Sequence, residues 1–179
     1  TNDMVCVLAN GLAGNTEITE ENEAYETFKK ALYLVMLHMT KMLAADGEGA
    51  SKLLTCKCSG APDADTATAV AKSVIRSPLV KSAMFGSDAN CGRILCAAGY
   101  ADAEFDVHKI DVSLVSKAGV IAVCADGNGI TFSEEKAASV LAEDEIEIRI
   151  NLNQGDGEAT AWGCDLTYDY VKINADYRS

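Results

Sequence analysis

The segment Glu145–Asn153 constrains the fold most, because its side chains alternate strictly between polar and apolar. This period of two predicts a β-strand. The apolar positions of the strand are Ile146, Ile148, Ile150 and Leu152. Asp156-Gly157 is typical of a tight hairpin turn, so Glu158–Asp165 is expected to return as an antiparallel strand. The chain therefore folds around a sheet that contains antiparallel strands.

Helices and further strands follow from the same kind of pattern. The other predicted strands are Met4–Asn10, Leu53–Ser59, Val107–Ser116 and Val120–Cys124. Apolar residues at spacings of three and four predict helices. The predicted helices are Glu20–Ala45, Asp65–Arg76, a short one from Pro78, Thr131–Ala142 opened by a Thr131/Glu134 capping box, and a last one capped by Thr167. Gly86–Arg93 is expected to be a polar loop. Helices in blocks between paired strands indicate a layered α+β fold.

Size and charge limit the classes of function. With 179 residues, 49% of them hydrophobic, the chain suits one domain over 1–179. Its net charge of −12 and scattered basic residues argue against nucleic-acid binding. No apolar run is long enough to cross a membrane, so no membrane partner is expected.

Seven cysteines at irregular spacings favour a reducing compartment, and hence the cytoplasm. Cys56 and Cys58 would point to one side of a strand, where packing explains them, and no second ligand pair has zinc-like spacing. We therefore expect no metal and no cofactor.

The first residue, Thr1, combines two groups that acyl transfer needs. Its Oγ can attack a carbonyl, and a free α-amine with a pKa of about 7.7–8.0 is a suitable base. Threonine with its own amine is a recognised activated nucleophile. A small first residue also occurs without any catalytic role, so Thr1 alone does not establish a nucleophile and both interpretations stay open.

Five blocks along the chain resemble the β chain of the ornithine acetyltransferase family. The blocks are the start Thr1-Asn2-Asp3 with Asn10-Gly11; 46–52; 75–83; 86–90 with Gly92-Arg93; and 165–171 with 174–179. They stand in the family's order and cover the chain from end to end. Cys91 departs from the pattern, because the family usually has Trp there. That difference puts the local packing in doubt and leaves the chemistry unaffected.

The resemblance implies an N-terminal-nucleophile-like, self-processing acyltransferase fold of layered sheets and helices. In this family a precursor cuts itself before the threonine and yields an α and a β chain. Thr1 would take the acetyl group from N-acetylornithine, and glutamate would then take it from Thr1, in arginine biosynthesis. Some members also use acetyl-CoA, which leaves the choice of donor open.

The resemblance also implies three further substrate-binding residues: Ser87, Asn174 and Ser179. Ser87 stands where many members have Glu and some have Ser. Asn174 and Ser179 match a pair in the family's tail. Glu48 and Lys52 could line the site or belong to a tight turn, and the sequence does not decide between these. Asp88, Asn90 and Arg93 are interpreted as a polar loop that braces Ser87.

A separate α chain would supply the oxyanion donors and complete a heterotetramer of two α and two β chains. Two alternatives stay open. An amidase or aminopeptidase of the same architecture would pass the acyl group to water. A non-catalytic subunit would not use Thr1 at all.

Overall fold

The computed structural model describes residues 3–176 of the chain. The chain divides into two compact units, with the boundary between Leu43 and Ala44. Thr1 and Ser179, two of the predicted site residues, lie outside the described residues.

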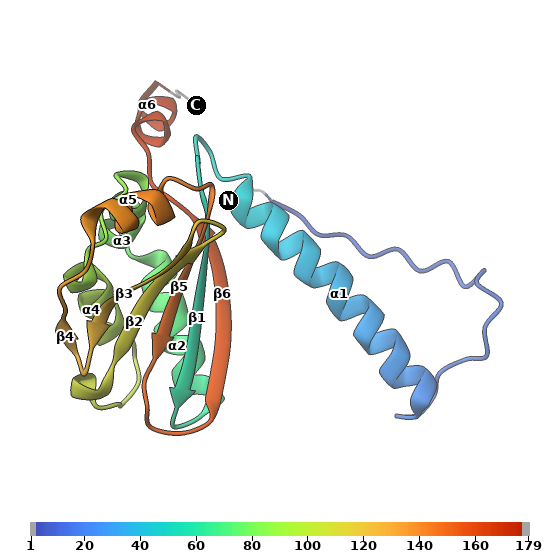
Figure 1. Ribbon diagram of the computed structural model, residues 1–179. Helices are drawn as coiled ribbons and strands as arrows, with labels where there is room; N and C mark the ends of the chain where they lie inside the picture. Colours follow the sequence, from blue (N-terminus) through green and yellow to red (C-terminus); the bar gives the residue numbers. More distant parts are fainter. Residues whose placement is uncertain (1–2, 177–179) are drawn as a thin grey trace. The chain divides into compact units, whose positions relative to one another are not determined.

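The first unit consists of an extended segment and all but the last two residues of the helix α1 (Glu23–Ala45) (Figure 1). The Asn22 side chain accepts a hydrogen bond from the Tyr25 amide, and Glu23 and Glu26 in the first turn suit the positive end of the helix. The long helix was therefore predicted correctly. The predicted strand Met4–Asn10 was wrong, because these residues have no strand partner in the described chain and stay exposed. An apolar run forms a strand only where another strand can pair with it.

A six-stranded sheet forms the centre of the second unit, in the order β4-β3-β2-β5-β1-β6 (Figure 1). The strands are β1 (Leu53–Ala61), β2 (Asp111–Ser116), β3 (Gly119–Ala125), β4 (Asn128–Gly129), β5 (Glu145–Asn151) and β6 (Gly157–Cys164). β1 and β5 are parallel, and all other neighbours are antiparallel. The α+β class was therefore predicted correctly.

Four helices share one hydrophobic core with a single face of this sheet. They are α2 (Ala64–Arg76), α3 (Pro78–Phe85), α4 (Cys91–Gly99) and α5 (Glu134–Leu141). The pairing register puts the buried side chains of neighbouring strands side by side, as with Leu54 opposite Ile146 and Cys56 opposite Ile148. Burial raises the pKa of the Cys56 and Cys58 thiols, that of Cys58 to about 11. Packing thus explains both cysteines.

The opposite face of the sheet is polar at its centre. There the Lys57 ammonium lies 2.7 Å from the Glu147 carboxylate, and Arg149 contacts the same carboxylate. The described residues of the second unit thus form two layers, one of strands and one of helices, as part of the layered fold that the sequence predicted.

The strands β5 and β6 do not form the predicted hairpin, because β1 lies between them. Their connection crosses the end of β1 and bonds to its backbone. The Leu152 amide donates to Ser59 O at 2.9 Å, and the Gln154 amide donates to Gly60 O at 2.7 Å. The prediction from Asp156-Gly157 was thus correct in that the chain reverses direction there. It was wrong in pairing β5 with β6, because strand order depends on contacts between distant parts of the chain.

Three smaller differences concern helix starts. Residues 91–93 belong to α4, capped by Asn90, rather than to a loop. Ser133 caps α5, in place of Thr131. Val107–Lys109 forms a short 3-10 helix before β2. The helix α6 (Tyr168–Asp176) starts as predicted, with the Tyr170 amide bonded to Thr167 Oγ1.

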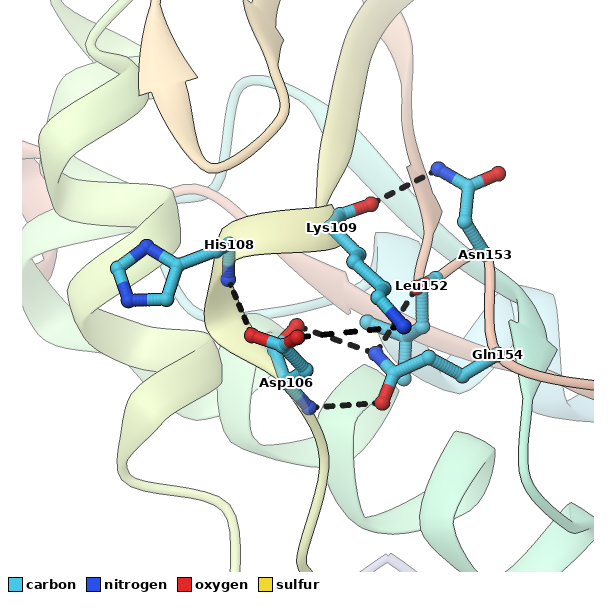
Figure 2. A network of polar contacts seen from close by, with 6 residues as sticks. All are labelled: Asp106, His108, Lys109, Leu152, Asn153 and Gln154. Carbon is cyan, nitrogen blue, oxygen red and sulfur yellow. Dashed lines mark hydrogen bonds and ion pairs between the residues drawn. The ribbon is translucent and has the colours of Figure 1, made fainter.

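Figure 2 shows the polar network that fastens the 3-10 helix to the connection between β5 and β6. The Asp106 amide donates to Gln154 Oε1 at 2.7 Å, and Gln154 Nε2 donates back to Asp106 O at 3.1 Å. Asn153 Nδ2 adds a bond of 2.8 Å to Lys109 O. This network lies where β5 ends and β2 begins, and it ties the loops at that end of the sheet together.

Candidate active site

The candidate site lies at the other end of the sheet, where β1 and β5 begin and β6 ends (Figure 1). Three segments meet there: the loop 46–52 before β1, the turn 84–90 between α3 and α4, and residues 164–174 after β6. Two of these segments carry the predicted site residues Ser87 and Asn174.

The buried carboxylate of Asp165 fixes the loop 46–52. Asp165 is 3% exposed and accepts hydrogen bonds from the backbone amides of Ser51 at 2.8 Å and Lys52 at 3.1 Å. The Ser51 hydroxyl also donates to it, and the Asp165 amide donates to Lys52 O at 3.2 Å. A buried charge is tolerated only when it is bonded in this way. The loop therefore has a defined position relative to the end of β6.

The Lys52 side chain leads from this loop to Ser87. Its Nζ donates to Met84 O at 2.8 Å, to Ser87 Oγ at 3.1 Å and to Leu141 O at 2.5 Å. Burial lowers the pKa of the Lys52 ammonium, and the attraction of Asp165 offsets part of this effect. The cation thus joins the ends of α3 and α5 to the turn that carries Ser87.

Ser87 is half-buried and has a φ of 53°, in the left-handed region. Its hydroxyl accepts from Lys52 Nζ and donates to Leu141 O at 3.2 Å. Non-glycine residues adopt such a φ rarely, usually where the surroundings impose it. The hydroxyl of Ser87 is therefore held in one direction.

Asn174 is exposed on α6, and the same loop reaches it through Glu48. Its Nδ2 donates to Glu48 Oε2 at 2.8 Å and to Tyr170 O at 2.9 Å.

Thr167 Oγ1 donates to Gly49 O at 2.6 Å, which joins the start of α6 to the loop. The loop 46–52 therefore contacts both Ser87 and Asn174. Lys52 and Glu48 of this loop thus bond through their side chains to the two predicted site residues, and a role of either toward a substrate stays a prediction.

The residues that follow Ser87 shape the turn. Asn90 Oδ1 accepts from the Arg93 amide at 3.0 Å, and Asn90 Nδ2 donates to Asp88 at 3.1 Å. Arg93 also donates to Leu79 O at 3.2 Å. These bonds shape the start of α4, and the interpretation of the three residues as a brace for Ser87 stays a prediction. Cys91 begins α4 and packs at the edge of the core.

The sequence did not single out Asp165, Met84 and Leu141 as part of the site. Two of them take part through backbone oxygens, which side-chain patterns do not reveal. Asp165 lay in one of the family-like blocks, and that was its only signal.

Two classes of site are not found between residues 3 and 176. No group of three or more His, Cys, Asp or Glu side chains there could hold a metal ion. No helix in that part of the chain is long and apolar enough to span a membrane.

Comparison with known proteins shows the family to which the chain belongs. The family model described as the ArgJ family matches residues 1–179. Arginine biosynthesis bifunctional protein ArgJ 1 of Clostridium acetobutylicum is 55% identical over 179 residues, and ArgJ of Symbiobacterium thermophilum is 49% identical. These matches cover 100% of the chain and 44% of each relative, so the chain spans less than half of their length.

A solved structure agrees with this. The crystal structure of the bifunctional protein ArgJ from Bacillus halodurans has a TM-score of 0.89 and 46% identity, and the match covers 99% of this chain and 82% of that one. The chain belongs to the ArgJ family.

Proposed function

We propose that this chain is the β chain of an ornithine acetyltransferase. It would move an acetyl group from N-acetylornithine to glutamate in arginine biosynthesis. The observation that carries the proposal is the ArgJ family match over residues 1–179, supported by relatives at 55% and 49% identity whose names give arginine biosynthesis.

In the proposed reaction Thr1 Oγ bonds to the acetyl carbon, and the Thr1 amine takes the hydroxyl proton. The bond from the acetyl carbon to nitrogen then breaks, and ornithine leaves with that proton on its amine. The glutamate amine attacks the acetyl-Thr1 ester in the second half and restores the Thr1 hydroxyl. Glutamate thus departs as N-acetylglutamate.

Ser87, Asn174 and Ser179 would bind the amino-acid part of the substrates. The contacts of the loop 46–52 support this for the two described residues, because they hold Ser87 and Asn174 at one end of the sheet. Two positions far apart in the sequence are thereby fixed by one segment, as a shared binding site requires.

A separate α chain would complete the enzyme as a heterotetramer of two α and two β chains in the cytoplasm. It would supply oxyanion donors, each worth roughly 3 kcal/mol of transition-state stabilisation. The apolar residues that α1 exposes when the first unit is taken by itself support a covering surface on another part of the enzyme. Its most exposed apolar residues are Phe28, Tyr33, Leu34, Val35 and Met42. The β chain alone is therefore expected to be inactive.

The test is acetyl transfer by the whole precursor, with N-acetylornithine and acetyl-CoA compared as donors. Thr1→Ala should abolish both self-cleavage and transfer, since it removes the attacking oxygen. Thr1→Ser keeps the hydroxyl and the amine and should retain part of both activities. Thr19→Ala is the matched control and should behave as wild type. Transfer by Thr1→Ala would contradict the proposal, and release of acetate in place of N-acetylglutamate would favour an amidase.

A further inference from the structure

We propose that Lys52 is a positioning residue, whose ammonium holds the Ser87 hydroxyl in place for the substrate. Lys52 would act only through Ser87 and would not touch the substrate itself. The inference rests on the proposed function, because Ser87 is there a substrate contact.

The three hydrogen bonds of Lys52 assign it this indirect role. An ammonium has three N–H donors. All three are used inside the protein, on Met84 O, Ser87 Oγ and Leu141 O. No donor is left for a substrate carboxylate, so the contribution of Lys52 to binding must pass through the groups that it holds.

The positions of the two carbonyl groups explain why a cation stands here. Met84 lies in the last turn of α3, and Leu141 is the last residue of α5. Carbonyl groups in the last turn of a helix lack the regular amide partner four residues further on and carry partial negative charge. Neither helix has a basic residue in its own last turn. Lys52 provides that positive charge from a different part of the chain.

The hydroxyl of Ser87 is fixed from two sides. It accepts from Lys52 Nζ at 3.1 Å and donates to Leu141 O at 3.2 Å. A hydroxyl has one donor and two acceptor lone pairs. One lone pair is therefore left for an outside group, and its direction is set by Lys52 and Leu141.

The backbone of Lys52 is itself anchored. Its amide donates to the Asp165 carboxylate at 3.1 Å, and its carbonyl accepts from the Asp165 amide at 3.2 Å. A continuous set of bonds thus runs from the end of β6 through Lys52 to Ser87. Removing the ammonium breaks this connection at its last step.

The experiment uses the two-chain enzyme and the variant Lys52→Met, which keeps an unbranched stem as far as the Cε position and removes all three donors. Lys72→Met is the control, because Lys72 is exposed on α2 and the substitution changes the charge equally. KM and kcat for N-acetylornithine are measured in the wild-type background and in the Ser87→Ala background. Loss of a correctly held hydroxyl should raise KM about three- to tenfold.

The combination of variants separates positioning from general destabilisation. Lys52→Met should raise KM in the wild-type background, leave it almost unchanged in Ser87→Ala, and leave kcat near wild type in both. Equal effects in the two backgrounds would overturn the inference, as would a loss confined to kcat. Lys52→Arg replaces Lys52→Met if the latter does not accumulate, because a planar guanidinium cannot reproduce three bonds from one atom.

A second readout does not depend on acetyl transfer. Hydrogen exchange of the Ser87 and Asp88 amides, which bond to Met84 O at 3.3 Å and Ala83 O at 2.9 Å, should be faster in Lys52→Met and unchanged in Lys72→Met. Unchanged exchange in Lys52→Met would overturn the inference. A wild-type enzyme without acetyl transfer would contradict the proposed function, and exchange would still decide whether Lys52 holds this turn.

Discussion

Single residues at this end of the sheet differ in how far the sequence could predict them. Ser87 and Asn174 were predicted because they belong to blocks that resemble a family. The contacts that hold them come from Lys52 and Glu48, which the sequence left undecided. Hydrogen bonds between residues so far apart in the chain depend on the tertiary fold, so local patterns cannot reveal them.

Glu147 on the open face of the sheet leads to a prediction about acid stability. Burial tends to raise the pKa of its carboxyl, but hydrogen bonds from Lys57 and Arg149 outweigh this and lower the pKa. In the unfolded chain the Glu147 carboxyl has its ordinary pKa of 4.5, so as the pH falls it is protonated in the unfolded chain before it is protonated in the folded one. Stability from Glu147 is present above that pH and is lost as the pH falls through the lowered pKa.

The measurement is thermal unfolding between pH 7 and acid, with Glu147→Gln compared to wild type. The variant should be slightly less stable at pH 7, by about 0.2–1 kcal/mol for a half-exposed pair, and should lose less stability toward acid. Glu145→Gln is the control on the same strand and should follow wild type. An identical acid dependence for wild type and Glu147→Gln would contradict the interpretation.

Among the elements, those with a clear period were predicted well. The strict alternation of β5 and the apolar stripe of α2 agree with the buried residues of both elements. The elements that were wrong depended on distant partners. The segment Met4–Asn10 had no strand to pair with in the described chain, and β1 separates β5 from β6. Periodicity predicts which residues are buried, whereas pairing order depends on the whole sheet.

The contact between the loop 46–52 and α6 gives a prediction for Gly49→Ala. Gly49 has a φ of +66°, and a Cβ there would lie 2.8 Å from the Tyr170 amide nitrogen. The methyl group should displace α6 and lower the free energy of unfolding by about 1–2 kcal/mol, with a higher KM because Asn174 moves.

Gly99→Ala is the matched control, because a Cβ at Gly99 meets no atom within 4 Å. Its effect on unfolding should stay below about 1 kcal/mol and KM should not change. Thermal unfolding and steady-state kinetics of both variants test whether the loop 46–52 fixes the position of α6. A Gly49→Ala enzyme as stable and active as Gly99→Ala would show that the loop does not fix α6.

At the scale of the whole molecule, the proposed α chain has to be set against the surfaces of each unit taken separately. Taken by itself, α1 exposes a series of large apolar residues, and within the second unit the helices that share the core pack on a single face of the sheet. The chain also spans only 44% of its relatives. These observations agree with the proposed α chain. The expectation of an α chain came from family resemblance and not from a physical pattern in the sequence.

The central claim is that Thr1 carries the acetyl group between donor and acceptor. The most direct test is the intact mass of this chain within the two-chain enzyme, after brief mixing with N-acetylornithine. We expect a gain of one acetyl group on Thr1, and glutamate should discharge it as N-acetylglutamate. Productive transfer with no acetylated Thr1, or an acetyl group that glutamate cannot remove, would contradict the claim.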